Sequence, residues 1–143
     1  MKVYISNDHH GVGLKIYLQN MLIADGYEVE DLGIEDPKEM VDFPQITKLV
    51  TDKLLDDKNA RGIIICGTGA GVVIAANRYR HIRATRCDRP EQAAADRFHD
   101  DVNVLALGAD DCDIEQAFLT AQAFLESKFD AIPRRIERIK QIS

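Results

Sequence analysis

The chain has 143 residues, 45% of them hydrophobic and 29% charged, and a formal net charge of −6 at pH 7. This length and composition indicate one domain spanning residues 1–143. No apolar run approaches the ~18 residues of a membrane span, so neither a membrane anchor nor a secretory leader is expected. The negative charge argues against a nucleic-acid surface, which would need a basic stripe, and means that an anionic ligand must be attracted by a few local cations and amides.

Predicted strands and helices alternate along the whole chain. Short β-branched or apolar runs predict strands, and apolar residues at helical spacing predict helices. In chain order the predicted elements are a strand at 2–6, a helix over 14–22, a strand at 27–32, a helix over 46–55, a strand at 63–65, a helix over 72–77, a strand at 82–85, a helix over 90–98, a strand at 102–107, a helix over 114–125 and a final helix that opens at Pro133. Gly26 is expected in a left-handed conformation that ends the first helix.

The fivefold alternation predicts an α/β fold with a doubly wound, five-stranded parallel sheet and helices on both faces. We expect a Rossmann-like architecture with the flavodoxin-like strand order 2-1-3-4-5. In such sheets ligands bind beyond the carboxyl ends of the strands, so the residues that follow the strands are the candidates for a site.

Cys66 ends the most apolar of these strands and precedes a glycine-rich turn. A cysteine on an apolar strand is usually a small buried hydrophobe. Here the amides of the turn and the dipole of the following helix would stabilise a thiolate, which favours a reactive cysteine. Cys87 and Cys112 lack such a setting and are interpreted as structural. The absence of any Cys-x-x-Cys motif argues against a disulfide framework or a zinc site and favours a reduced, cytoplasmic protein.

The turn itself, Gly67-Thr68-Gly69-Ala70-Gly71, predicts a cradle for an oxyanion or a small phosphate. It lacks the Lys-Ser/Thr pair of a P-loop, and it follows the third strand rather than the first, where a dinucleotide fingerprint belongs. A tight strand-to-helix turn without any ligand remains the alternative.

Polar residues follow the first strand and precede the last one. Asp8, His9 and His10 stand at one strand end, where adjacent histidines point to opposite faces, so only one of the two is expected in a site. His99 lies at the end of the helix before the fifth strand and is a candidate proton donor. No ligand spacing supports a metal site among these residues and Cys66, so no metal is expected.

Arg134 and Arg138 are four residues apart on the last predicted helix. They share one face of that helix and are placed to hold one phosphate together. A solvated basic face is the alternative interpretation.

Together these residues resemble the sugar-phosphate isomerase family that includes ribose-5-phosphate isomerase B and the galactose-6-phosphate isomerase subunits. The resemblance extends over essentially the whole chain. It rests on Asn-Asp-His-x-Gly at 7–11, Asp-x-Pro at 42–44, Ile-Cys-Gly-Thr-Gly-x-Gly at 65–71, Ile-Ala-Ala-Asn at 74–77, Ile-Arg-Ala at 82–84, His-x-Asp-x-Asn-Val-Leu-Ala-x-Gly at 99–108, and the Arg134 and Arg138 pair.

The resemblance implies an aldose–ketose isomerase of carbohydrate metabolism that works through an ene-diol, with no metal and no cofactor. Ribose 5-phosphate and ribulose 5-phosphate, metabolites of the pentose phosphate pathway, are the expected substrates. The family further implies a homodimer, or a pair of dimers, in which residues of the neighbouring chain complete each site.

The same resemblance assigns roles to individual residues. Cys66 is the base that moves the proton between C1 and C2, His99 is the acid that helps open the sugar ring with Asp8 nearby, and Thr68 shuttles hydroxyl protons. The remaining residues bind substrate: the amides of Gly67, Thr68, Gly69, Ala70 and Gly71 hold the oxyanion, and Asp8, His9, Asp100, Arg134 and Arg138 bind hydroxyls and phosphate.

Several positions depart from the family pattern, and none of them is the expected base, acid or oxyanion cradle. Asp110 stands where an arginine usually reaches a phosphate, Asp100 where asparagine is usual, Phe43 where tyrosine is usual, and Arg135 where histidine is usual. We expect Arg135 to replace part of the charge lost at position 110. These departures leave open another sugar phosphate as substrate, such as galactose or allose 6-phosphate or a tetrose phosphate.

Two other classes of protein share parts of this pattern. A signalling receiver domain has a similar topology but needs an aspartate at the end of strand three, where this chain has Cys66. A catalytically silent sugar-phosphate-binding subunit is the other alternative, and the joint presence of Cys66, Thr68 and His99 argues against it.

Overall fold

The structure is a computed structural model that describes all residues from 1 to 143. Every predicted strand and helix is present, with ends shifted by a few residues. The strands are β1 (Lys2–Asn7), β2 (Glu28–Asp31), β3 (Arg61–Cys66), β4 (Ala84–Arg86) and β5 (Val104–Gly108). The helices are α1 (Val12–Ala24), α2 (Phe43–Asp56), α3 (Ala70–Ala76), α4 (Pro90–Asp100), α5 (Ile114–Glu126) and α6 (Pro133–Ile142), and a 3₁₀ turn covers His9–Gly11.

The five strands form one parallel sheet in the order β2-β1-β3-β5-β4. The doubly wound parallel sheet is confirmed, but the expected order 2-1-3-4-5 is wrong for the last two strands. All five residues of β5 are buried, which suits a strand with a neighbour on each side. β4 has only three residues, all half-buried, and therefore forms the edge.

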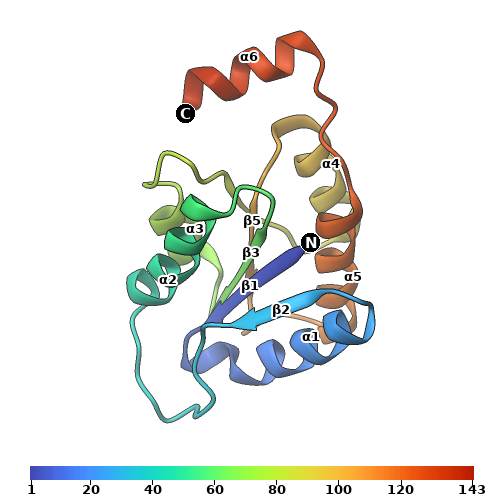
Figure 1. Ribbon diagram of the computed structural model, residues 1–143. Helices are drawn as coiled ribbons and strands as arrows, with labels where there is room; N and C mark the ends of the chain where they lie inside the picture. The colour runs from blue at the N-terminus through green and yellow to red at the C-terminus, as the bar shows by residue number, and fades with distance from the viewer.

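The strands alternate between two apolar cores. Ile63 and Ile65 of β3 face the core formed with α1, α4 and α5, whereas Ile64 and Cys66 face the core formed with α2 and α3. Figure 1 shows these two helix layers on opposite sides of the sheet. This alternation, which follows from the two-residue period of a strand, places the Cys66 side chain on the α2–α3 side.

Helix α6 differs from the others because none of its residues is buried. It projects beyond the body of the molecule (Figure 1), and its nearest helix is α4. Ile136 and Ile142 on this helix remain exposed. None of the helices has the length and apolar character needed to cross a bilayer.

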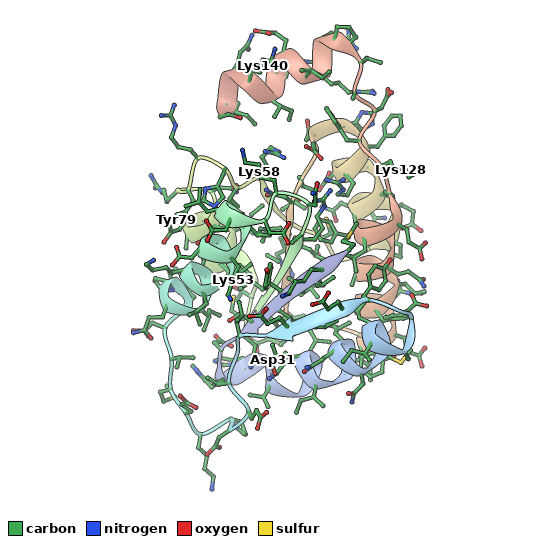
Figure 2. All side chains as sticks on the ribbon, viewed as in Figure 1. Asp31, Lys53, Lys58, Tyr79, Lys128 and Lys140 are labelled. Carbon is green, nitrogen blue, oxygen red and sulfur yellow. The ribbon has the colours of Figure 1, made fainter.

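Lys15 is the largest side chain that the fold buries completely. Its ammonium donates to the carboxylate of Asp31 at 2.6 Å, at the carboxyl end of β2, and the second oxygen of Asp31 accepts from the Gly33 amide. Asp31 is labelled in Figure 2. The pair joins α1 to the loop after β2. Because the Lys15 ammonium is buried, it depends on the Asp31 carboxylate as its counter-charge.

Replacing Asp31 by asparagine should leave the Lys15 ammonium buried without a counter-charge. We expect Asp31→Asn to lower the free energy of unfolding by about 3 kcal/mol, measured by urea denaturation. Asp52→Asn is the matched control, because Asp52 pairs with Lys48 on the exposed surface of α2 and its loss should change stability little. Equal effects of the two variants would contradict the importance of the buried pair.

Candidate active site

A cleft of about 370 Å³ opens at the carboxyl edge of the sheet, where the sequence places the candidate site. Its walls come from the loops after β1, β3 and β5 and from the first residue of α2. The lining residues are Asp8, His10, Phe43, Cys66, Gly67, Thr68, Gly71 and Asp110. Three of the four predicted catalytic residues, Asp8, Cys66 and Thr68, therefore meet in one cleft.

Cys66 stands at the floor of this cleft with only 5% of its surface exposed. The backbone amide of Gly69 donates to its Sγ atom at 3.1 Å. A backbone amide at a helix N-terminus that donates to sulfur is the kind of setting in which reactive cysteines are found. The turn thus supports a nucleophile or base at Cys66 directly, through a hydrogen bond.

The backbone conformation of Gly69 makes that hydrogen bond possible. Its φ of 79° is left-handed, and a side chain there would stand 3.0 Å from the Cδ and Nε atoms of Arg86, which packs against the turn from the end of β4. Both observations explain a glycine at this position. Arg86 is not among the site residues predicted from the sequence, because its contact with the turn depends on the pairing of distant strands.

Among the remaining backbone amides of the turn, some donate a hydrogen bond within the chain and others have no acceptor there. The amide of Ala70 donates to Thr68 Oγ1 at 3.3 Å, which fixes the threonine side chain in the turn. The amides of Gly67 and Thr68 have no acceptor within the chain. Free amides beside the Cys66 sulfur are suited to hold a negatively charged oxygen.

Asp8 is 7% exposed and begins the 3₁₀ turn, where its Oδ1 accepts from the His10 amide at 2.9 Å. This bond holds the carboxylate at the wall of the cleft. Of the two adjacent histidines, His10 lines the cleft, while His9 is half-buried behind it with their ring centroids 4.4 Å apart. The Nδ1 atom of His9 is buried and has no partner.

Asp110 and Phe43 also line the cleft. Asp110 Oδ1 lies 3.2 Å from His10 Nδ1, and its Oδ2 lies so close to Gly67 that a side chain there would collide at 2.7 Å. Phe43 packs against Gly71 in the same way, with ring atoms 3.1 Å from the position of a side chain. The sequence marks these two positions as departures from the family pattern, but their place in the walls depends on contacts between separate loops.

His99 and Asp100 lie at the opposite edge of the sheet. Helix α4 carries the chain from the carboxyl end of β4 back to the amino end of β5, and both residues are in its last turn. A six-residue strand such as β3 spans roughly 20 Å, at about 3.3 Å per residue. His99 therefore cannot reach Cys66 of its own chain.

Asp101 fixes this end of α4. It has a left-handed φ of 50°, and its carboxylate accepts from Arg97 at 2.7 Å and from Arg83 at 2.9 Å. These charged bonds hold a backbone conformation that a residue other than glycine rarely adopts. The exposed side chain of His99 is thereby presented outward at a defined place.

Arg134 and Arg138 lie on α6, beside the same amino edge. Both are exposed, and neither forms an ion pair within the chain, so they remain available to an anion. Like His99, they are remote from the cleft that holds Cys66. One chain thus contains two separate halves of the predicted site.

The other two cysteines have the character of structural residues. Burial and the nearby Asp96 carboxylate raise the pKa of Cys87 to about 12, although a hydrogen bond with Thr85 lowers it. Burial also raises the pKa of Cys112. Neither forms a reactive thiolate near neutral pH. No group of three or more His, Cys, Asp or Glu side chains is arranged to hold a metal ion.

Comparisons with known proteins agree on one family. The family model described as Ribose/Galactose Isomerase matches residues 3–142. The structure of a ribose 5-phosphate isomerase from Thermotoga maritima is 40% identical, with a TM-score of 0.93 over 99% of this chain and 96% of that one. Ribose-5-phosphate isomerase B from Mycoplasma genitalium, solved with bound ribulose-5-phosphate, is 32% identical, with a TM-score of 0.93 over 99% and 93% of the two chains. The 4-deoxy-4-sulfo-D-erythrose isomerase of a Clostridium species is 33% identical over 126 residues, which cover 84% of this chain and 79% of the relative.

Substituting Gly69 should damage the turn without touching a functional side chain. A left-handed alanine costs about 1–2 kcal/mol, and Arg86 must also shift, so we expect Gly69→Ala to lower the free energy of unfolding by at least that amount in urea denaturation. Gly13→Ala is the control, because a side chain at Gly13 of α1 meets nothing within 4 Å and should stabilise the helix by about 0.5–1 kcal/mol. Unchanged stability of Gly69→Ala would refute the left-handed geometry of the turn.

Proposed function

The chain belongs to the ribose/galactose isomerase family and is an aldose–ketose isomerase of sugar phosphates, and on that premise we propose that it interconverts ribose 5-phosphate and ribulose 5-phosphate. The observation that carries this proposal is the Cys66 thiol at the end of β3, which accepts a hydrogen bond from the Gly69 amide beside two free amides. The names of the two solved relatives support the choice of the pentose phosphate.

Cys66 acts as the base in this proposal. Its thiolate removes the proton from C2 of the open-chain aldose, which gives an ene-diolate and a thiol, and the thiol returns the proton to C1 to form the ketose. The charge that develops on O1 is stabilised by the free amides of Gly67 and Thr68. The Thr68 hydroxyl moves the proton between O1 and O2.

Asp8 and His9 bind the sugar hydroxyls near the base. The Asp8 carboxylate is already fixed by the amide of His10 and so reaches the cleft in a single orientation. The unpartnered Nδ1 atom of His9 leaves that ring with a hydrogen-bonding group to satisfy. A substrate hydroxyl would satisfy it after a small rotation of the ring.

A second copy of the chain supplies the other half of the site. His99, Asp100, Arg134 and Arg138 lie at the amino edge of the sheet and cannot serve Cys66 of their own chain. In a homodimer, or a pair of dimers, the exposed α6 of one copy crosses to the cleft of the other. His99 then helps to open the sugar ring, and the two arginines hold the phosphate.

This arrangement also explains how an acidic protein attracts an anionic substrate. With a net charge of −6, the protein as a whole repels a sugar phosphate. Arg134 and Arg138, one helical turn apart and without carboxylate partners, provide a local cationic site. The free energy of binding the phosphate therefore depends on these two residues more than on the overall field.

A different sugar phosphate is the second candidate substrate, and the residues that line the cleft support this alternative. Asp110 Oδ1 and His10 Nδ1 lie 3.2 Å apart in the lining of the cleft. A carboxylate there repels a phosphate and accepts bonds from hydroxyls, which suits a substrate of another length, such as a tetrose phosphate. The name of the Clostridium relative specifies a four-carbon sugar that carries a sulfo group, so a related chain is named for a four-carbon substrate.

The proposal is tested by incubating the protein with aldose and ketose phosphates of four to six carbons and following isomerisation. We expect the highest kcat/KM for ribose 5-phosphate and ribulose 5-phosphate. Cys66→Ala should lower kcat by about 10³-fold, within the range that a positioned base contributes. Cys87→Ala is the matched control and should retain activity, because that thiol is buried away from the cleft.

Two outcomes would contradict the assignment. Substantial turnover by Cys66→Ala would exclude this thiol as the base. A strong preference for a tetrose or hexose phosphate would reject the pentose and select the second candidate.

A further inference from the structure

Four side chains form a continuous contact where α6 meets the end of α4. Arg135 Nη1 donates to the Asp130 carboxylate, and Arg135 Nη2 lies 3.0 Å from Nδ1 of His99. The guanidinium also stacks on the ring of Phe98, with its central carbon 4.8 Å from the ring centroid. One of these residues, His99, opens the sugar ring in the proposed function. Arg135 itself has no role in that proposal.

The contact with Arg135 determines where His99 carries its proton. A guanidinium has five N–H donors and no acceptor, so the bond at 3.0 Å requires an unprotonated Nδ1. The proton of the neutral imidazole is then on Nε2.

Arg135 is held firmly enough to impose this arrangement. Its side chain is only 12% exposed. The Asp130 carboxylate binds one end of the guanidinium, and the Asp130 amide donates in turn to the carbonyl of Phe98 at 3.0 Å. The backbone amide of Arg135 donates to Ile132 at 3.0 Å in the first turn of α6. Its charge is thus already paired, which sets it apart from the unpaired Arg134 and Arg138.

We infer that Arg135 is a positioning residue that keeps His99 as a neutral Nε2–H donor aimed away from its own chain. This inference rests on the proposed function, in which His99 serves the cleft of a neighbouring copy. There the Nε2–H group donates a hydrogen bond to a sugar oxygen, while Nδ1 stays occupied by Arg135. Arg135 therefore acts on the substrate through His99, and the cation that compensates for Asp110 is not this residue.

The tautomer of His99 provides a direct test that requires no substrate. The chain has four histidines, so ¹⁵N-labelled imidazoles in the intact protein give few signals, and a His99→Gln variant identifies the one that belongs to His99. At about pH 8, where an unperturbed imidazole is neutral, we expect His99 to carry its proton on Nε2 alone. In Arg135→Met this preference should be lost.

In steady-state kinetics, we expect the loss of Arg135 to lower kcat and to leave KM nearly unchanged. We expect Arg135→Met to lower kcat by about 10- to 100-fold, as found for residues that orient a functional histidine, with KM changed by less than about twofold. Lys140→Met is the matched control, because it removes one charge from the same helix (Figure 2) and Lys140 forms no ion pair. It should leave both the tautomer and kcat unchanged.

Several outcomes would overturn the inference. A proton on Nδ1 of His99 in the unaltered protein would exclude the bond from Arg135. A raised KM with unchanged kcat in Arg135→Met would instead make Arg135 a phosphate ligand.

If Arg135→Met does not fold, Asp130→Asn provides a second test, because it loosens the same guanidinium and should weaken the preference of the His99 proton for Nε2. An unchanged tautomer in that variant would likewise contradict the inference. Absence of isomerisation by the unaltered protein would contradict the proposed function, whereas the tautomer measurement would still decide the role of Arg135.

Discussion

All five strands run parallel, so each crossover helix returns the chain from the carboxyl edge of the sheet to the amino edge. This constraint separates the functional residues into two groups. Cys66, Thr68 and Asp8 follow strands and gather at the carboxyl edge, whereas His99 ends a crossover helix and lies at the amino edge. Roughly 20 Å of sheet separates the groups, so one chain cannot bring Cys66 and His99 together.

The sequence predicts well those features that local physics determines. The turn after β3 was predictable because Ile63–Ile65 specifies a buried strand and the glycines specify the tight turn that follows. The order of β4 and β5 was not, because it depends on which strand pairs with β3 across the sheet, and the lengths of the two strands become informative only once their pairing is known. The contact of Asp110 with His10 likewise joins two loops that are distant in sequence.

The two halves of the site differ in how they are stabilised. At the carboxyl edge, the backbone amide of Gly69 donates to Cys66, and the side chains of Arg86 and Asp110 pack against the same turn. At the amino edge, ion pairs organise the end of α4, through Asp101 with its two arginines and through Asp130 with Arg135. In the site that we propose, Cys66 and the amides of its turn come from one copy, and the ion pair that positions His99 comes from another.

The shared site is tested most directly by combining two inactive variants in one dimer. Cys66→Ala and His99→Ala chains, carrying different tags, are co-expressed, and the mixed dimer is purified through both tags. If the site is shared, one of its two sites contains an intact Cys66 and an intact His99, so the mixed dimer should recover about half the activity of the unaltered dimer. A mixed dimer as inactive as either variant alone would contradict the account.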